Sequence, residues 1–262
     1  MSKKREDGEE VEEFEEPSLE DFLIDEEDDE DTRRRKKRRT KWKKAIATTV
    51  AIGLLFSAVG ALFNMFSIDA IQFLQTSYRL SQQEDIQEYR QSVVTVQGET
   101  SRGTGFTISE DGFIVTNDHV IEGERNITVA FRDGELYEGE VVETYPEIDI
   151  AFLKIDGEDL TFLPLRDQSS EAGEDIYVIG NPLSFTQIAN EGTIIASQQS
   201  PLQISAPIYR GNSGSPVIAK GGHVVGVVYA KTAPSLWSRE RPVGLAVPVD
   251  TVIDYLPEGI EP

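Results

Sequence analysis

The chain has 262 residues, 39% of them apolar, which is enough for one sizeable domain with extensions or for two small barrels and excludes a wholly disordered protein. It has no cysteine, which excludes disulfides, a thiol nucleophile and thiolate-bound metal sites. Its 47 acidic and 25 basic residues give a net charge of -22, which argues against a nucleic-acid-binding surface over most of the chain.

Charged residues are concentrated in blocks at the N-terminus. Residues 1–31 carry 17 acidic and 3 basic side chains and few large apolar ones, so we expect an acidic, disordered tail in the cytoplasm. The sign reverses in residues 32–44, where ten of the twelve residues from Arg33 to Lys44 are basic. We expect a juxtamembrane collar there, because a basic run beside an apolar segment is typical of contact with lipid headgroups.

Residues 45–68 contain no ionisable side chain. As a helix with a rise of about 1.5 Å per residue, they would span about 36 Å and cross a hydrocarbon core of roughly 30 Å. A buried core helix and a cleaved signal peptide are the alternatives, although the segment lacks a polar face and 44 residues precede it. We predict one transmembrane helix, a signal anchor that crosses the cell membrane once, with a cytoplasmic N-terminus and an extracytoplasmic remainder.

Residues 69–91 lack Gly and Pro and are expected to form a helical stem. From residue 92 onward, short apolar or β-branched runs alternate with Gly-containing turns, which predicts an all-β sandwich or pair of barrels. Helices are expected there only after His119 and from Asp250 to Leu256. The expected strands are 93–96, 105–108, 113–115, 127–131, 150–155, 176–179, 193–196, 224–228 and 244–247.

The segment Gly211-Asn212-Ser213-Gly214 is a candidate for chemistry. A serine nucleophile needs two backbone N–H groups that converge on the developing oxyanion, and glycine permits the sharp bend that aims them. The N–H groups of Gly211 and Ser213 are the expected donors of this oxyanion hole. The alternative is a loop between two strands without a chemical role.

The chain contains two histidines, His119 and His223. His119 follows an apolar strand and is expected to act as a general base at the strand end, with a core or capping role as the alternative. His223 follows two glycines at a predicted hairpin tip, where a solvated surface side chain is expected. No second histidine or carboxylate cluster lies at ligand spacing from His119, so no metal and no cofactor are expected.

Asp149 begins the strand-like run from Asp149 to Ile155. A period of two places Asp149 on the same face as three apolar residues, and this face is expected to point inward because Lys154 lies on the other. A charge at the end of an apolar face needs a partner, and the imidazole of His119 would supply one. The alternative is an aspartate that caps a strand at the rim of the sheet.

The order His, Asp, Ser across an all-β region resembles the chymotrypsin-like serine proteases, and within them the bacterial HtrA or Deg-type branch. This resemblance implies a protease domain over residues 92–262 that consists of two six-stranded β-barrels. It places catalytic His119 and Asp149 in the first barrel and the nucleophile Ser213 in the second. The segments that carry the resemblance are 103–106, 111–121, 149–155, 178–182, 211–214 and 244–248.

Two departures from the family pattern bear on function. Ser215 stands where the family usually has a second glycine. The chain between Ala196 and Ser213 looks shorter than in family members, so the loops that shape the cleft are expected to differ. Most relatives carry PDZ domains after the protease domain, and peptide recognition through such a domain is not expected here.

The family also suggests where the substrate side chain would bind. The floor of its primary specificity pocket lies about six residues before the nucleophile, which is Pro207 here, and the wall comes from the strand with Val228 and Tyr229. None of these residues is a carboxylate, so an entering Lys or Arg would leave its charge desolvated and unpaired. Cleavage after Val, Ala, Ile or similar residues is expected, because burial of a small aliphatic group is favourable.

The sequence therefore predicts a membrane-anchored, extracytoplasmic serine endopeptidase of HtrA type with a role in protein quality control. Its expected partners are polypeptide substrates such as misfolded proteins, and membrane lipid through the span and the basic collar, with no nucleic acid and with a homo-oligomer as an option. One alternative is a catalytically silent, protease-like binding or sensor domain tethered to the membrane. Another is a protein that binds its partners through the charged N-terminal blocks.

Overall fold

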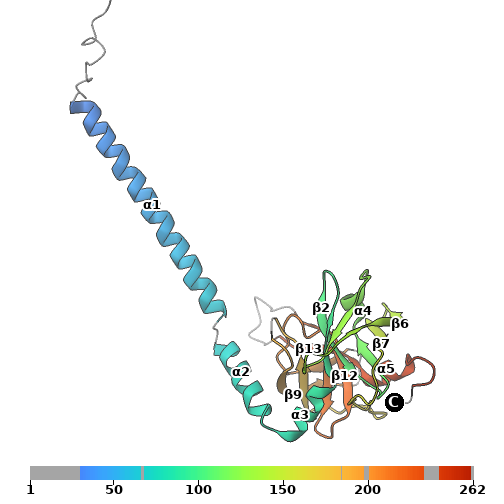
Figure 1. Ribbon diagram of the computed structural model, residues 1–262. Coiled ribbons are helices and arrows are strands. Elements are labelled where there is room, and N and C mark those ends of the chain that lie inside the picture. The colour runs from blue at the N-terminus through green and yellow to red at the C-terminus, as the bar shows by residue number, and fades with distance from the viewer. Residues whose placement is uncertain (1–29, 66–67, 184, 198–200, 233–241, 261–262) are drawn as a thin grey trace, which may run out of the picture. The chain divides into compact units, whose positions relative to one another are not determined.

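The computed structural model describes residues 30–65, 68–183, 185–197, 201–232 and 242–260 (Figure 1). The chain divides into two compact units, Met1–Met65 and Phe66–Pro262. The predicted acidic tail, residues 1–31, lies outside the described residues except for its last two positions.

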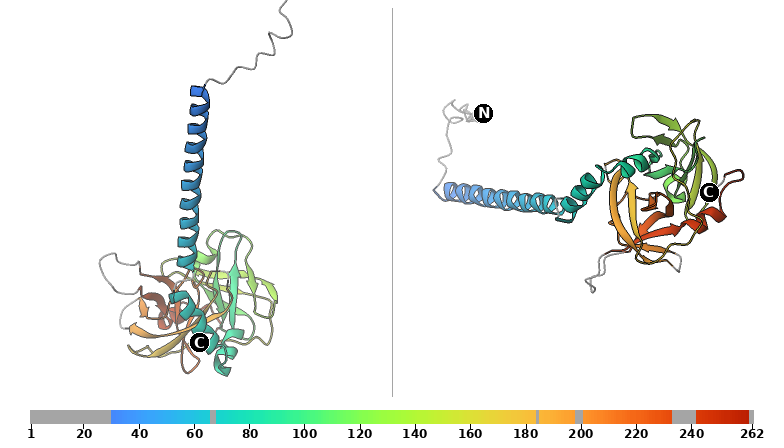
Figure 2. Two further views of the ribbon diagram at one scale, coloured as in Figure 1. Left: turned by 90° about the vertical axis from the view of Figure 1, so that its left-hand side faces the viewer. Right: turned by 90° about the horizontal axis from the view of Figure 1, so that it is seen from below.

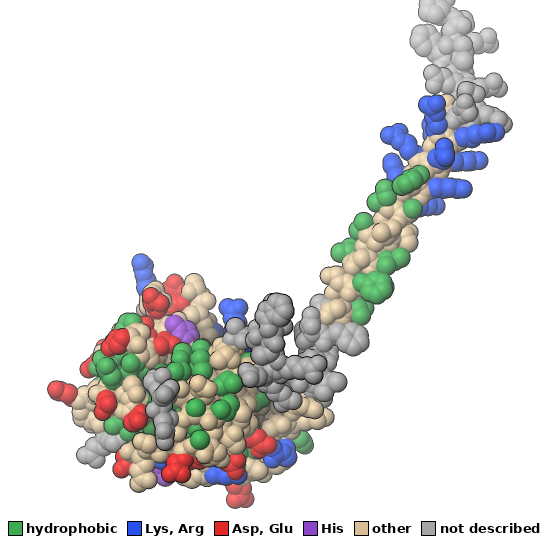
Figure 3. Space-filling model, turned by 180° about the vertical axis from the view of Figure 1, so that it is seen from behind, with side chains coloured by type: hydrophobic (Ala, Val, Ile, Leu, Met, Phe, Trp, Pro, Cys, Tyr) green, Lys and Arg blue, Asp and Glu red, His purple; other side chains and the backbone are tan. Residues whose placement is uncertain are grey.

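The first unit contains one long helix, α1 (Glu30–Met65), which joins the predicted collar and most of the predicted span in a single element. Lys and Arg side chains crowd one end of this helix, and hydrophobic side chains line the part that follows (Figure 3). The segment Thr32–Gly60 is long and apolar enough to cross a membrane, and none of its side chains is buried. This exposure separates the segment from the core helix of a soluble domain, although a signal sequence would pass the same test of length and composition.

The predicted stem forms two helices of the second unit, α2 (Ile68–Leu80) and α3 (Glu84–Gln91). α2 packs against strand β9 (Ile188–Ala196). Leu80 at the end of α2 and Ile86 in α3 are completely buried in the core. The two helices are thus part of the folded domain.

The first sheet has seven strands in the order β5-β4-β1-β2-β3-β7-β6. Its two edge strands follow each other along the chain with only Gly139 between them, so one bent segment joins the two edges of the sheet. Counted as one strand, this segment gives the sheet the six strands of a barrel. The elements of this region are β1 (Val93–Gln97), β2 (Arg102–Thr107), β3 (Phe113–Thr116), α4 (Asp118–Ile121), β4 (Thr128–Ala130), β5 (Leu136–Glu138), β6 (Glu140–Tyr145) and β7 (Ile150–Lys154).

The second sheet is a closed barrel of six antiparallel strands in the order β10-β13-β12-β11-β8-β9. Figure 2 shows it beside the first sheet, in orange and red against green. The last helix packs on β12 and β13. The elements are β8 (Asp175–Gly180), β9, β10 (Leu202–Ile204), β11 (Pro216–Ala219), β12 (Val224–Lys231), β13 (Gly244–Pro248) and α5 (Val249–Asp254).

Three clusters of buried apolar side chains form the core of this domain. One fills the first sheet and includes Val96 and Leu153, and a second fills the closed barrel and includes Ile204. The third lies between the sheets, where Phe152 of the first sheet meets Val227 of the second. Side chains alternate along β7 between the first and third clusters, so one face of this strand packs in the first sheet and the other packs at the interface of the two sheets. The expected all-β pair of barrels is therefore present.

The strands that sequence reasoning missed lack an apolar face or are very short. β5 and β6 are mostly exposed at the edges of the sheet, so no alternation of buried residues marks them. β10 has three residues, and β11 begins with Pro216 directly after the glycine-rich loop.

Candidate active site

His119 and Asp149 meet at the end of two paired strands. His119 lies in the short helix α4 directly after β3, and Asp149 immediately precedes β7, which pairs with β3. The imidazole Nδ1 lies 2.7 Å from Oδ2 and 2.9 Å from Oδ1 of Asp149. The backbone N–H of His119 donates to Oδ1 at 3.0 Å. One carboxylate thus holds both the ring and the backbone of the histidine, and the other ring nitrogen, Nε2, is the one suited to proton transfer.

Asp149 reaches this position through a left-handed backbone conformation. Its φ is +55°, a region that aspartate tolerates better than most residues and that strained functional positions often occupy. Its carbonyl oxygen accepts a hydrogen bond of 2.7 Å from the side-chain amide of Asn117, two residues before His119. The side chain is 26% exposed, so it lies at the rim of the sheet and not on the inward face that a period of two predicts.

The environment of His119 favours its protonated form. The hydrogen bond that His119 donates to Asp149 raises the pKa of His119 above its ordinary value, and this effect exceeds the opposing effect of burial. Burial also raises the pKa of the carboxyl of Asp118, the preceding residue. The imidazole nevertheless pairs with Asp149 and not with its sequence neighbour.

Ser213 lies in the loop between β10 and β11, and hydrogen bonds attach this loop to β2 of the first sheet. The backbone N–H of Thr104 donates to the Ser213 carbonyl oxygen at 2.8 Å. The Oγ1 of Thr104 donates to the Gly211 carbonyl oxygen, also at 2.8 Å. A Cβ atom at Gly103 would lie 3.1 Å from the Ser213 carbonyl oxygen and 2.7 Å from Val120 of α4. At Gly103 the serine loop, β2 and the histidine helix therefore come together.

The glycines on either side of Ser213 are required by their surroundings. Gly214 has a φ of +83°, and a Cβ atom there would lie 1.9 Å from the Thr104 carbonyl oxygen. Gly211 has a φ of +99°, and its Cβ would lie 2.4 Å from the Asn181 carbonyl oxygen. Both positions combine a left-handed backbone with contact against another chain segment, which only glycine satisfies.

The two expected oxyanion donors have no acceptor within the described part of the chain. Neither the N–H of Gly211 nor that of Ser213 is hydrogen-bonded there, whereas the N–H of Gly214 is bonded to the Val228 carbonyl oxygen at 2.8 Å. The carbonyl oxygen of Arg210 accepts a hydrogen bond from the loop after β8. Because a trans peptide unit is planar, the Gly211 N–H points in the opposite direction, away from that loop.

Asn181 fastens the serine side of the site to the first sheet, a role that its motif alone did not reveal. It follows β8 and is buried. Its backbone N–H donates to Thr104 Oγ1 at 2.9 Å and its side-chain amide donates to the Val94 carbonyl oxygen at 2.8 Å. Its Oδ1 accepts from the Gln187 N–H at 2.8 Å. Thr104 and Asn181 thus form a polar clamp between the two barrels.

The three residues expected to form the specificity pocket do not line a common cavity. Pro207 is exposed and lines a cavity of about 430 Å³ together with Ile208 and Tyr209. Val228 is completely buried in the core of the second barrel, and Tyr229 is half-buried at the cluster between the sheets.

Helix α2 forms one side of the cavity that Pro207 lines. Phe73 of α2 is 8% exposed, and its ring makes an edge-to-face contact with Tyr209, with 4.6 Å between the ring centroids. The segment before β1 therefore touches the loop that leads to Gly211. Nothing in the glycine-free pattern of residues 69–91 predicts this contact.

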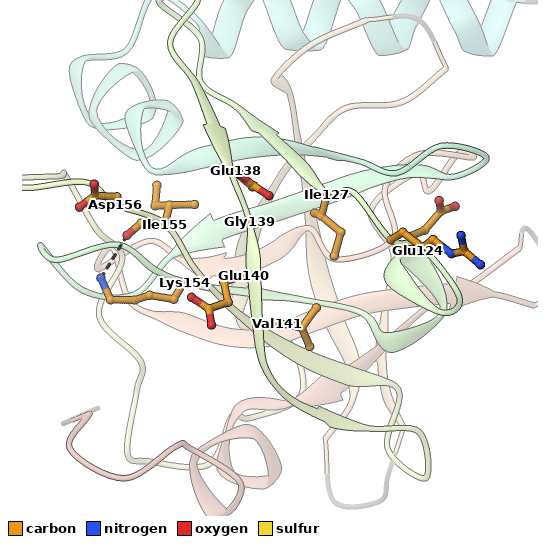
Figure 4. A pocket seen from close by; sticks show the side chains of 10 residues that line it. Glu124, Ile127, Glu138, Gly139, Glu140, Val141, Lys154, Ile155 and Asp156 are labelled. Carbon is orange, nitrogen blue, oxygen red and sulfur yellow. Dashed lines mark hydrogen bonds between the residues drawn. The ribbon is translucent and has the colours of Figure 1, made fainter.

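A larger cavity of about 740 Å³ lies away from these residues, along β5 and β6 (Figure 4). Four carboxylates line it, together with Lys154 and Arg125. Lys154 points to the carbonyl oxygen of Ile155, to which it donates at 3.1 Å. Within the described residues, no group of three or more His, Asp or Glu side chains is arranged to hold a metal ion.

Comparisons with known proteins agree with this geometry. A family model described as a trypsin-like peptidase domain matches residues 103–227. The chain is 35% identical over 166 residues to a probable periplasmic serine endoprotease, DegP-like, of Pseudomonas fluorescens, covering 59% of this chain and 34% of the relative. It is 27% identical over 226 residues to the serine endoprotease DegS of Haemophilus influenzae, covering 79% and 66%.

The fold has a counterpart among solved structures. The serine endoprotease from Yersinia pestis matches with a TM-score of 0.60 and 28% identity, covering 65% of this chain and 63% of that one. The expected resemblance to HtrA or Deg-type proteases and the chymotrypsin-like double barrel are confirmed by these matches. The chain spans about a third of the length of the DegP-like relative.

Proposed function

We propose that this protein is a serine endopeptidase in which His119, Asp149 and Ser213 act as a catalytic triad. The observation that carries the proposal is the pair of hydrogen bonds between Asp149 and the Nδ1 of His119, 2.7 and 2.9 Å long. This arrangement fixes the ring tautomer that leaves Nε2 unprotonated and able to act as a base. The family match and the attachment of the serine loop beside α4 support the same assignment.

In the proposed mechanism, Ser213 Oγ attacks the carbonyl carbon of the scissile peptide bond while His119 Nε2 takes the hydroxyl proton. The carbonyl oxygen becomes an oxyanion and accepts hydrogen bonds from the N–H groups of Gly211 and Ser213. As the C–N bond breaks, the imidazolium returns the proton to the leaving amine, which leaves an acyl group on Ser213. Water then attacks the acyl carbon while His119 Nε2 takes its proton. The bond between the acyl carbon and Ser213 Oγ breaks as the imidazolium returns this proton to Oγ, which releases the acid and restores the serine. Asp149 stabilises the imidazolium in both halves.

Labelling with a fluorophosphonate probe tests the proposal directly, because such probes react with an activated serine. We expect the full chain to be labelled, and Ser213→Ala and His119→Ala to lose both labelling and peptide hydrolysis, the latter by about 10⁴-fold or more. His223→Ala is the matched control. His223 is exposed and its Nδ1 contacts the carbonyl oxygen of nearby Gly221, so its loss leaves turnover intact. An unlabelled wild-type protein would favour a silent, protease-like binding domain.

We also propose that the domain works outside the cytoplasm on polypeptides in protein quality control, anchored by α1. The DegP-like relative is named as periplasmic, and α1 carries an apolar segment next to ten basic residues. We still expect cleavage after small apolar residues. Glu191 is the one carboxylate among the described residues that line the cavity beside Pro207. Glu191 forms an ion pair with Arg79 at 2.5 Å, and Lys231 lines the same cavity, so the lining carries no net negative charge to attract Lys or Arg. A proteome-derived peptide library would contradict this expectation if most cuts followed Lys or Arg.

A further inference from the structure

A third, smaller cavity opens beside Gly211, at the other end of the loop that begins with Pro207. Its volume is about 320 Å³, and Arg102, Arg210, Leu183 and Glu99 contribute to its lining. Arg102 begins β2 and Arg210 directly precedes Gly211, so the two guanidinium groups come from different barrels. Both arginines are exposed.

These two arginines place two positive charges at one cavity in a region with a large excess of acid. After residue 44 the chain has 30 acidic and 12 basic residues. Four of the basic residues form ion pairs in the described domain: Arg79, Lys154, Arg166 and Lys220. Neither Arg102 nor Arg210 forms an ion pair with any described residue. The one carboxylate in the lining, Glu99, accepts a hydrogen bond of 3.0 Å from the Asn126 amide.

The position of the two arginines relative to the reacting groups follows from β2. Arg102 lies two residues before Thr104 on the same face of the strand, and Thr104 is bonded to the carbonyl oxygens of both Gly211 and Ser213. Two residues of a strand span about 7 Å. A group held by Arg102 and Arg210 would therefore belong to one of the first few substrate residues next to the scissile bond.

The proposed function indicates on which side of the scissile bond a substrate group held by the two arginines would lie. The cavity beside Pro207 would take the side chain of the acyl group, and the cavity with Gly211 lies at the opposite end of the same loop. We infer that Arg102 and Arg210 form a subsite for a carboxylate on the leaving-group side, within about three residues of the scissile bond. The subsite makes the enzyme selective for sequences with an acidic side chain just after the cut. This inference rests on the proposed function.

Matched peptides test the subsite. Internally quenched substrates with a C-terminal amide would carry Glu or Gln at one of the first three positions after the same cleavable bond. We expect kcat/KM to favour Glu by about tenfold at low salt, and about 0.5 M NaCl to reduce this preference. Arg102→Gln and Arg210→Gln should each lower the preference and the double variant should abolish it. Lys220→Gln is the control, because this exposed lysine pairs with Asp175 at the ends of β11 and β8 that lie away from Ser213 and Asn181.

A binding measurement separates this inference from the proposed function. Ser213→Ala protein and the same peptides labelled for fluorescence anisotropy report the Glu preference without turnover. If Ser213→Ala protein binds the Glu peptides more tightly than the Gln peptides but the wild type hydrolyses neither, the subsite is upheld and the protease assignment is overturned. Equal binding and equal hydrolysis of Glu and Gln peptides would overturn the subsite alone. A third peptide, which ends in a free carboxylate at the third position after the bond, distinguishes an acidic side chain from a chain terminus. Tighter binding of this peptide than of the Glu peptides would overturn the selectivity for a side chain.

Discussion

Asp149 combines several contacts at one strained residue. Its left-handed backbone turns the carboxylate toward both the ring and the N–H of His119, and the Asn117 amide holds its carbonyl oxygen. A backbone conformation of this kind costs on the order of 1 kcal/mol and persists only where several neighbours determine it. The strain is therefore tied to the orientation of the imidazole.

The raised pKa of His119 predicts the pH dependence of hydrolysis. A general base must be unprotonated, and the hydrogen bond to the Asp149 carboxylate raises the pKa of His119. Activity should therefore be lost as the pH falls through a value above about 6.5. Asp149→Asn removes the charge that stabilises the imidazolium. We expect this variant to lose about 10⁴-fold in kcat and to shift the acid limb of its residual activity to lower pH. The pH profile of kcat/KM measures both, and an unshifted limb would exclude Asp149 as the partner.

Gly180 explains how the serine in place of the usual glycine at position 215 is accommodated. A Cβ atom at position 180 would lie 2.1 Å from Ser215 Oγ and 2.8 Å from Asn212 Oδ1. Gly180→Ala should therefore destabilise the chain by about 1–3 kcal/mol, and Ser215→Gly should restore most of the loss by removing the closer contact. Free energies of unfolding for the two single variants and the double variant measure the coupling. Additive losses would show that the two residues do not compete for this space.

At the level of elements, α2 supports the loop that leads to the nucleophile. Phe73 → Ala would remove the ring contact with Tyr209 and expose a side chain that is now buried. A buried Phe→Ala change costs about 3–5 kcal/mol in a core. We expect this loss of stability to appear as local opening of α2 and not as unfolding of the whole domain. Hydrogen exchange in α2 should be faster, and kcat should fall several-fold. Leu74→Ala is the control, because Leu74 is 41% exposed. Unchanged exchange and turnover in Phe73→Ala would show that the contact supports neither element.

The sequence identifies the elements with strong local patterns and misses those defined by distant contacts. The apolar strands before His119 and after Asp149, and the glycines around Ser213, follow from short-range rules and from the family resemblance. The exposed edge strands β5 and β6 lack a pattern because each joins the sheet through backbone pairing. The clamp of Thr104 and Asn181 links positions 77 residues apart in the chain, which no local pattern reveals.

At the level of the whole molecule, charge is distributed by segment. Ten basic residues lie within residues 33–44, and the region after residue 44 has 30 acidic against 12 basic residues. An apolar, unburied helical segment follows the basic run. A basic flank is retained on the cytoplasmic side of a membrane span, whereas an acidic domain meets no comparable barrier to export. The basic flank and the acidic domain together favour an orientation with the N-terminus in the cytoplasm and the domain outside it.

This orientation can be tested with sealed vesicles that expose the extracytoplasmic face, or with intact cells. Protease added from outside should degrade the region after Asp69 and spare an epitope tag placed before residue 1, and detergent should make the tag accessible. Replacing the basic residues from Arg33 to Lys44 with Gln should weaken the bias and produce a mixed population, because the positive charges determine the orientation. A tag that is accessible without detergent in the wild-type chain would reverse the topology. A soluble domain released from the membrane with a cut inside residues 45–68 would instead identify the apolar segment as a cleaved signal sequence.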